Sequence, residues 1–303
     1  MSHDHAHAHH SHGGHTDFSR AFAVGVALNA AYVVAQIVFG LAAHSLALLA
    51  DAGHNFGDVL GLVLAWCAIY LGKSRATDRR TYGLGRSSIL AALANAILLL
   101  LAVGGITWEA IRRFSHPGEV AGRTVMIVAA LGIVINGTTA MFLSAGNERD
   151  LNIKGAFLHM AADAAVSAGV LIAGVVILFT GWHWIDPVAS LVINIVIVWG
   201  TWGLLRRSLS MALDLVPENV DASAVRRFLE TQNGVTAVHD LHIWPLSTTR
   251  IALTVHLEMP NGPAGGDLFL HDLCEQLHLQ FGIEHSTVQI EQNAETCSLA
   301  PEH

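Results

Sequence analysis

Charge is scarce in this 303-residue chain: Asp, Glu, Lys and Arg make up only 13% of it, whereas 52% of the residues are hydrophobic. Basic residues are the scarcer sign, and the net charge of −8 leaves no basic surface of the kind that nucleic acids require. Cysteine is also rare, and Cys67, Cys274 and Cys297 lie in separate parts of the chain. These absences exclude a nucleic-acid partner and argue against a disulfide framework.

The apolar residues are gathered in blocks. Six blocks are long enough to cross a hydrocarbon core, which takes about 20 helical residues. They cover residues 21–41, 46–71, 89–108, 124–143, 157–179 and 187–205. The sequence therefore predicts an α-helical membrane protein with six transmembrane helices between residues 20 and 207.

Lys and Arg in the short connections indicate the orientation of these helices. The connection after the second span carries five of them, and further basic residues flank the outer ends of the helical region. The connections on the opposite side of the membrane have fewer basic residues, namely Arg112, Arg113 and Arg123. This bias predicts that both termini lie in the cytoplasm.

Two apolar spans each contain a His and an Asp four residues apart. His54 and Asp58 lie in the second span, and His159 and Asp163 in the fifth. Residues four apart share a helix face, so each span offers one imidazole and one carboxylate, and together they supply the four ligands of a tetrahedral zinc shell. Ionisable groups at bilayer depth are costly, which favours a metal site over simple interhelical hydrogen bonds.

Two further acids lie in or beside the spans. Asp51 precedes His54 by one helical turn and could line the same cavity as an acid. Asp186 stands just before Pro187, at the start of the sixth span, and we expect it to cap that helix.

The first 19 residues have low complexity and are predicted to be disordered. Seven histidines alternate there with small and polar residues: His3, His5, His7, His9, His10, His12 and His15. Such a tract can collect metal ions loosely. An expression tag is the alternative interpretation.

The composition changes at residue 208, where a small soluble domain is predicted to begin. Residues 221–232 and 267–281 have helical patterns, and residues 235–244, 249–259 and 285–291 have strand patterns. The order helix, strand, strand, helix, strand is compatible with a ferredoxin-like α+β fold over residues 208–303.

Several longer motifs resemble those of the cation diffusion facilitator family, in particular its bacterial zinc, cadmium and cobalt exporters. The matching segments are SLALLADAGHNFGD, TYGLGRSSILAALANA, LNIKGAFLHMAAD, WIDPVAS, VHDLHIWPL and LTVHLEM. The resemblance implies six transmembrane helices and a cytoplasmic ferredoxin-like domain, working as a homodimer in the bacterial inner membrane. It also implies an exchange of a divalent metal ion for protons, with transport ligands His54, Asp58, His159 and Asp163.

The resemblance suggests a second, regulatory metal site in the soluble domain. It would use His239 and His256 on strands, His271 on a helix and Glu291, at the interface of two subunits. Surface histidines without a ligand are the alternative. Some relatives hold another metal in the loop after the second span, but Arg80 and Leu84 replace the imidazoles that would accompany Asp78, so we expect no filled site there.

Two imidazoles with two carboxylates suit zinc, cadmium or cobalt better than magnesium, calcium or manganese. Zinc is then the substrate and a possible regulatory ion, and no organic cofactor is expected. Protons compete with the metal for the same atoms, which provides an exchange mechanism. A membrane metal sensor without transport is the alternative function. A membrane metalloprotease lacks support because neither HNFGD nor HMAAD carries a water-activating Glu.

Overall fold

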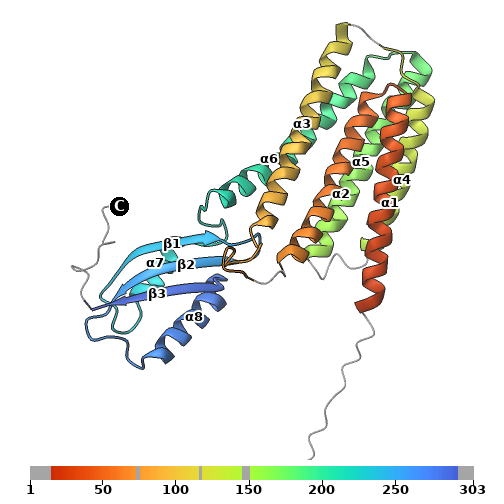
Figure 1. Ribbon diagram of the computed structural model, residues 1–303. Coiled ribbons are helices and arrows are strands. Elements are labelled where there is room, and N and C mark those ends of the chain that lie inside the picture. Colours follow the sequence, from red (N-terminus) through yellow and green to blue (C-terminus); the bar gives the residue numbers. More distant parts are fainter. Residues whose placement is uncertain (1–14, 73–75, 116–117, 145–150, 293–303) are drawn as a thin grey trace, which may run out of the picture. The chain divides into compact units, whose positions relative to one another are not determined.

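The computed structural model describes residues 15–72, 76–115, 118–144 and 151–292, so most of the His-rich tail and Cys297 lie outside the described residues. Six long helices are followed by a small domain with a sheet (Figure 1). The long helices are α1 His15–Ala42, α2 Leu46–Gly72, α3 Ser87–Ser115, α4 Gly122–Ser144, α5 Leu151–Thr180 and α6 Ile185–Ala212. Helix α1 begins at His15, inside the segment that was predicted to be disordered.

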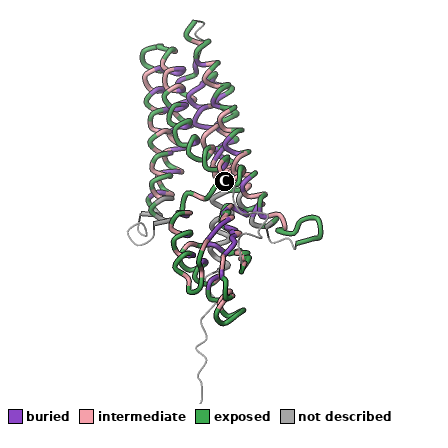
Figure 2. Tube along the Cα trace, turned by 90° about the vertical axis from the view of Figure 1, so that its left-hand side faces the viewer, coloured by how far each residue is buried: buried purple, intermediate pink, exposed green. Residues whose placement is uncertain are grey.

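Four of these helices, α3 to α6, are long and apolar enough to cross a membrane within the described part of the chain, and α1 adds a shorter apolar stretch, Ala27–Ala42. Between 22% and 33% of the residues in their most apolar windows are buried. Exposed residues follow the outer sides of the helices (Figure 2), and they include large aromatic side chains such as Trp199, Phe179 and Trp108. An apolar exterior of this kind is suited to contact with lipid.

The chain divides into two compact units. The first contains the residues up to Val59 together with Leu101–Val198, and the second contains Leu60–Leu100 together with Trp199–His303. Helices α2, α3 and α6 therefore each contribute residues to both units.

Asp186 caps a different helix from the one predicted. Its carboxylate accepts hydrogen bonds from Ser45 Oγ at 2.5 Å, Leu46 N at 2.6 Å and Ala47 N at 3.2 Å, all at the start of α2. The expectation that Asp186 caps α6 was therefore wrong. The cause is a long-range contact: free N–H groups at the start of α2 attract a carboxylate from the first turn of α6.

Arg113 completes this arrangement at the end of α3. Its guanidinium lies 3.8 Å from Asp186 and 3.3 Å from Glu109, and it also donates to the carbonyl of His44. A basic residue with these partners serves the packing of the bundle, which explains its place on the side where the sequence has few basic residues.

Helices α4 and α5 approach closely at two glycines. A Cβ atom on Gly122 would lie 2.9 Å from the carbonyl oxygen of Gly174, and one on Gly174 would lie 3.0 Å from the amide of Met126. Larger residues at these positions would push the two backbones apart. This contact holds α5, which carries His159 and Asp163, against α4.

The soluble domain has the predicted order of elements: α7 Ala222–Glu230, β1 Ala237–Pro245, β2 Ile251–Glu258, α8 Asp267–Phe281 and β3 His285–Glu291. Strand β2 is central, antiparallel to β1 and parallel to β3. Asp221 is the N-cap of α7, and Gly282 is the C-cap of α8.

One face of the sheet forms the core of this domain. Leu253, Val255 and Leu257 of β2 are fully buried and belong to one cluster with residues of α7 and α8. His256 alternates with them and therefore faces the opposite side of the sheet.

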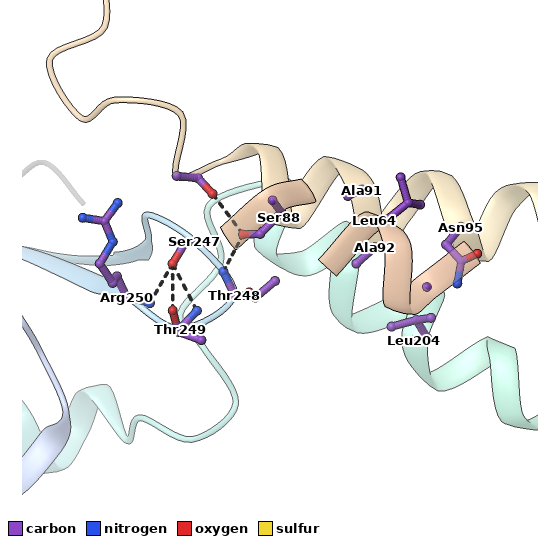
Figure 3. Close-up of a pocket in the computed structure, with 13 residues that line it drawn as sticks. Leu64, Ser88, Ala91, Ala92, Asn95, Leu204, Ser247, Thr248, Thr249 and Arg250 are labelled. Atoms are coloured by element: carbon purple, nitrogen blue, oxygen red, sulfur yellow. Dashed lines mark hydrogen bonds between the residues drawn. The ribbon is translucent and has the colours of Figure 1, made fainter. Parts of the chain in front are cut away.

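Within the second unit, the connection before α3 contacts the turn between β1 and β2. Ser88 Oγ donates to the carbonyl of Gly85 at 2.9 Å and accepts from the amide of Thr248 at 3.1 Å (Figure 3). Gly85 is required there, because a Cβ atom would lie 2.6 Å from Arg250 Nη2 and 2.9 Å from a backbone carbonyl. A cavity of about 470 Å³ lies beside this contact, between α2, α3, α6 and the turn.

Replacement of Asp186 tests its role as the cap of α2. Asp186→Ala leaves the N–H groups of Leu46 and Ala47 and the Arg113 guanidinium without their acceptor, so we expect a loss of about 3 kcal/mol in stability. Unfolding of the detergent-solubilised protein, followed by tryptophan fluorescence, measures it. Glu119→Ala removes an exposed carboxylate and is the control. Equal stability of the two variants would contradict the assigned role.

Candidate metal centre

The four His and Asp residues predicted as transport ligands lie together between α2 and α5. His54 Nε2 is 3.0 Å from Asp163 Oδ1 and 3.8 Å from Asp58 Oδ2. His159 Nε2 is 3.4 Å from Asp58 Oδ2 and 3.6 Å from Asp163 Oδ2. Each imidazole thus faces both carboxylates, one on its own helix and one on the other.

These spacings match the edges of a small coordination shell. Ligand atoms about 2.1 Å from a tetrahedral zinc ion lie about 3.4 Å from one another, and the four His–Asp distances run from 3.0 to 3.8 Å. His54, Asp58 and Asp163 offer ligand atoms that are all within 4.8 Å of one another. His159 lies outside that group of three, although it contacts both carboxylates.

The four side chains differ in exposure. Asp163 is 2% exposed and His54 23%, whereas Asp58 is 33% and His159 44% exposed. Asp163 therefore forms the closed side of the centre, and His159 its open side.

A second group of metal-binding side chains lies on the face of the sheet opposite the helices. His239 Nε2 is 3.1 Å from Glu291 Oε2, and His256 Nδ1 is 3.0 Å from Glu291 Oε1. The two imidazole rings are 5.2 Å apart. All three side chains are at most 10% exposed, and they form a compact group of potential ligands.

Asp240 joins this group and was missed in the sequence. Its Oδ2 lies 3.5 Å from His256 Nε2, and its Oδ1 is 2.9 Å from His242 Nε2. A register shift between His239 and His242 places one extra residue in β1, and Asp240 has φ 48° there. Such a bulge breaks the two-residue alternation of a regular strand.

His271 does not join this group within one chain. It is 75% exposed on α8, where it lies with Asp272 and Glu275. Helix α8 packs through Leu273 and Leu277 into the core on the other face of the sheet. The sheet itself therefore separates His271 from His239, His256 and Glu291.

Two family models together match nearly all of the chain. The model of the cation efflux transmembrane domain matches residues 22–213. The model of the cation efflux protein cytoplasmic domain matches residues 217–293. The chain belongs to the cation efflux family. This cation efflux protein is a multi-pass membrane transporter and not an enzyme.

Relatives of this cation efflux protein carry names that describe the transport of metal cations. It is 36% identical to the cation efflux system protein CzcD of Alcaligenes sp. strain CT14, over 93% of this chain and 89% of that protein. It is 34% identical to the cadmium, cobalt and zinc/H(+)-K(+) antiporter of Bacillus subtilis, over 87% and 86% of the two chains. It is 33% identical to the zinc transporter ZitB of Escherichia coli, over 96% and 93%.

The unequal exposure of the four side chains predicts an order of their effects on zinc affinity. Asp163→Ala removes a buried carboxylate that faces both imidazoles, and we expect affinity to fall about 100-fold or more. His159→Ala removes an exposed ligand that water can replace, and we expect a fall of about tenfold.

Zinc titration against a competing chelator dye measures both affinities. The background lacks residues 1–14 and carries His239→Ala, His256→Ala and His271→Ala, so the other groups of histidines in the described residues do not contribute. Glu230→Ala, at an exposed residue, is the control. A larger effect of His159→Ala than of Asp163→Ala would contradict the assignment of the closed and open sides.

Proposed function

We propose that this transporter exports Zn²⁺, and also Cd²⁺ or Co²⁺, from the cytoplasm in exchange for protons. His54, Asp58, His159 and Asp163 would bind the ion between α2 and α5. The observation that carries the proposal is the alternating contact of two imidazoles with two carboxylates, at spacings suited to one tetrahedral ion. The names of the ZitB and antiporter relatives support zinc as the substrate, and the name of the CzcD relative supports cation efflux.

The chemistry of the ligands supports proton exchange. Zinc requires neutral imidazoles and ionised carboxylates, and protons require the same nitrogen and oxygen atoms. A centre that is partly exposed, as at His159, allows the two to replace each other. Protons arriving from outside would release zinc on that side, and the returning centre would carry the protons inward.

The membrane potential limits the stoichiometry. Each charge moved against 100 mV costs about 2.3 kcal/mol, so a divalent ion costs twice that on export and one returning proton recovers only half. One-for-one exchange therefore works against the potential. A pH gradient or a higher number of protons per ion must supply the difference.

We also propose that the chain crosses the inner membrane of a bacterial cell six times, with both termini in the cytoplasm. The predicted spans coincide with the six long helices, and the bias of basic residues in the connections supports the orientation. The soluble domain, residues 208–303, would then be cytoplasmic and ferredoxin-like.

In that domain we propose a regulatory metal site made by His239, His256 and Glu291, with Asp240 as a further ligand. Their mutual contacts and low exposure support it. His271 would have to come from a second copy of the chain, because α8 lies on the other face of the sheet. A metal held in this way would bring two cytoplasmic domains of a homodimer together.

Transport by the purified protein in vesicles tests the main proposal. Vesicles that contain a zinc dye are placed in zinc, with the interior more acidic than the outside. We expect zinc to enter and protons to leave. Asp58→Ala and Asp163→Ala should each abolish uptake, because a three-ligand centre binds zinc about 100-fold more weakly or worse.

Two results would contradict this function. Unchanged uptake in either carboxylate variant would remove the ligand assignment. Zinc binding without any uptake by the wild-type protein would favour the metal sensor.

Removal of one imidazole tests the cytoplasmic site. We expect His256→Ala to lower the number of tightly bound zinc ions by one per chain, because Glu291 and Asp240 both lose their shared partner. Elemental analysis after dialysis measures the ratio, and His278→Ala, on α8, is the control. An unchanged ratio would show that these side chains do not bind metal.

A further inference from the structure

Asp51 is a fully buried carboxylate on α2, one turn before His54. Its Oδ2 accepts hydrogen bonds from Gln36 Nε2 at 2.7 Å and from Ser167 Oγ at 3.2 Å. Its Oδ1 is buried and has no hydrogen-bond partner among the described residues. A buried carboxylate with an unpaired oxygen, at the depth of the metal ligands, costs free energy among apolar helices. Asp51 is therefore a candidate for a functional role.

No Lys or Arg in the described part of the chain lies within 4.0 Å of this carboxylate, so no fixed cation balances its charge. The titratable groups that face it are Tyr32 from α1, His54 from its own helix and Asp163 from α5. Helix α4 contributes the Val128 carbonyl, which accepts from Tyr32, and Gly132. The variable positive charges available near Asp51 are therefore the transported ion, a proton and the His54 imidazole.

The donors around Asp51 are held in fixed positions. Gln36 Nε2 also donates to the hydroxyl of Tyr32 at 3.0 Å, and Gln36 Oε1 accepts from Asn55 Nδ2 at 2.9 Å. The amide of Gln36 therefore presents its NH₂ group to Asp51. Ser167 differs, because a hydroxyl can donate to an ionised carboxylate and accept from a protonated one.

Gly132 of α4 leaves room for the side chains of this network. A Cβ atom on Gly132 would lie 2.0 Å from the Tyr32 hydroxyl and 2.7 Å from Ser167 Oγ. Residues of α1, α2 and α5 are thus brought to one carboxylate that forms hydrogen bonds to none of the four metal ligands among the described residues.

We propose that Asp51 binds an additional proton that the transporter exchanges for metal, at a site separate from the metal ligands and besides the protons that compete for the ligand atoms. This inference rests on the proton exchange proposed above. With zinc bound, the two ligand carboxylates neutralise the ion and Asp51 stays ionised. When zinc leaves, the charge of the ligand carboxylates is no longer neutralised, and a proton moves from water to Asp51. The proton returns to water when the next zinc ion binds.

The test compares two modes of transport by full-length Asp51→Asn in vesicles. Exchange of zinc across the membrane at equal pH, followed with labelled zinc, requires binding and movement but no net proton transfer. Zinc uptake with an internal pH dye reports the protons moved per zinc ion. We expect exchange to stay within about twofold of wild type and the count to fall by about one proton per zinc ion.

Asp58→Asn and Asn194→Leu are the comparison variants. Asp58→Asn should lose both modes, as expected of a ligand. Asn194 is a buried amide on α6 that bonds to Thr107 at 2.8 Å, and its replacement should leave the proton count unchanged. Asp51→Asn that keeps the wild-type proton count overturns the inference, and a folded variant that loses exchange as well shows a structural role instead.

Asp51→Glu provides a second test if Asp51→Asn does not fold. It keeps a carboxyl group in the same cavity, so we expect proton coupling to remain and the pH midpoint of uptake to shift. An unchanged pH midpoint overturns the inference. Absence of proton movement in the wild-type protein would instead overturn the proposed exchange itself.

Discussion

The structure depends on the cost of holding charged side chains among apolar helices. Asp58 and Asp163 each face two imidazoles, and the contacts cross between α2 and α5 in both directions. Neither helix satisfies its own pair alone, because His54 lies nearer to Asp163 than to Asp58. The His–Asp pair of α2 and the His–Asp pair of α5 therefore stabilise each other. A divalent ion between them would replace the four His–Asp contacts with four coordination bonds to the ion.

The position of α2 follows from a similar constraint at its start. Asp186 satisfies the first N–H groups of the helix and Arg113 balances its charge. These contacts fix the beginning of α2 against α3 and the start of α6. His54 lies two turns later, so its position relative to α5 depends on a capping interaction far from the metal centre.

Local sequence patterns were sufficient to predict much of the structure of this protein. The spacing of His54 and Asp58, and of His159 and Asp163, predicted which side chains share a helix face, and strand β3 and helix α8 lie where their patterns placed them. The errors involve contacts distant in sequence or irregular backbone. The cap formed by Asp186 joins residues about 140 positions apart. The role of Asp240 depends on a bulge with positive φ, which no alternation predicts.

The unequal exposure of the four side chains bears on how exchange could proceed. Asp163 is almost completely enclosed, whereas His159, four residues earlier on the same helix, is the most exposed of the four. A metal ion entering from the exposed side would meet His159 and Asp58 first and Asp163 last. Release would follow the reverse order unless the exposed side changes. Export in one direction therefore requires a movement of α2 against α5 that opens the side closed by Asp163. The small residues and close backbone contact between α4 and α5 favour movement of these two helices as one body.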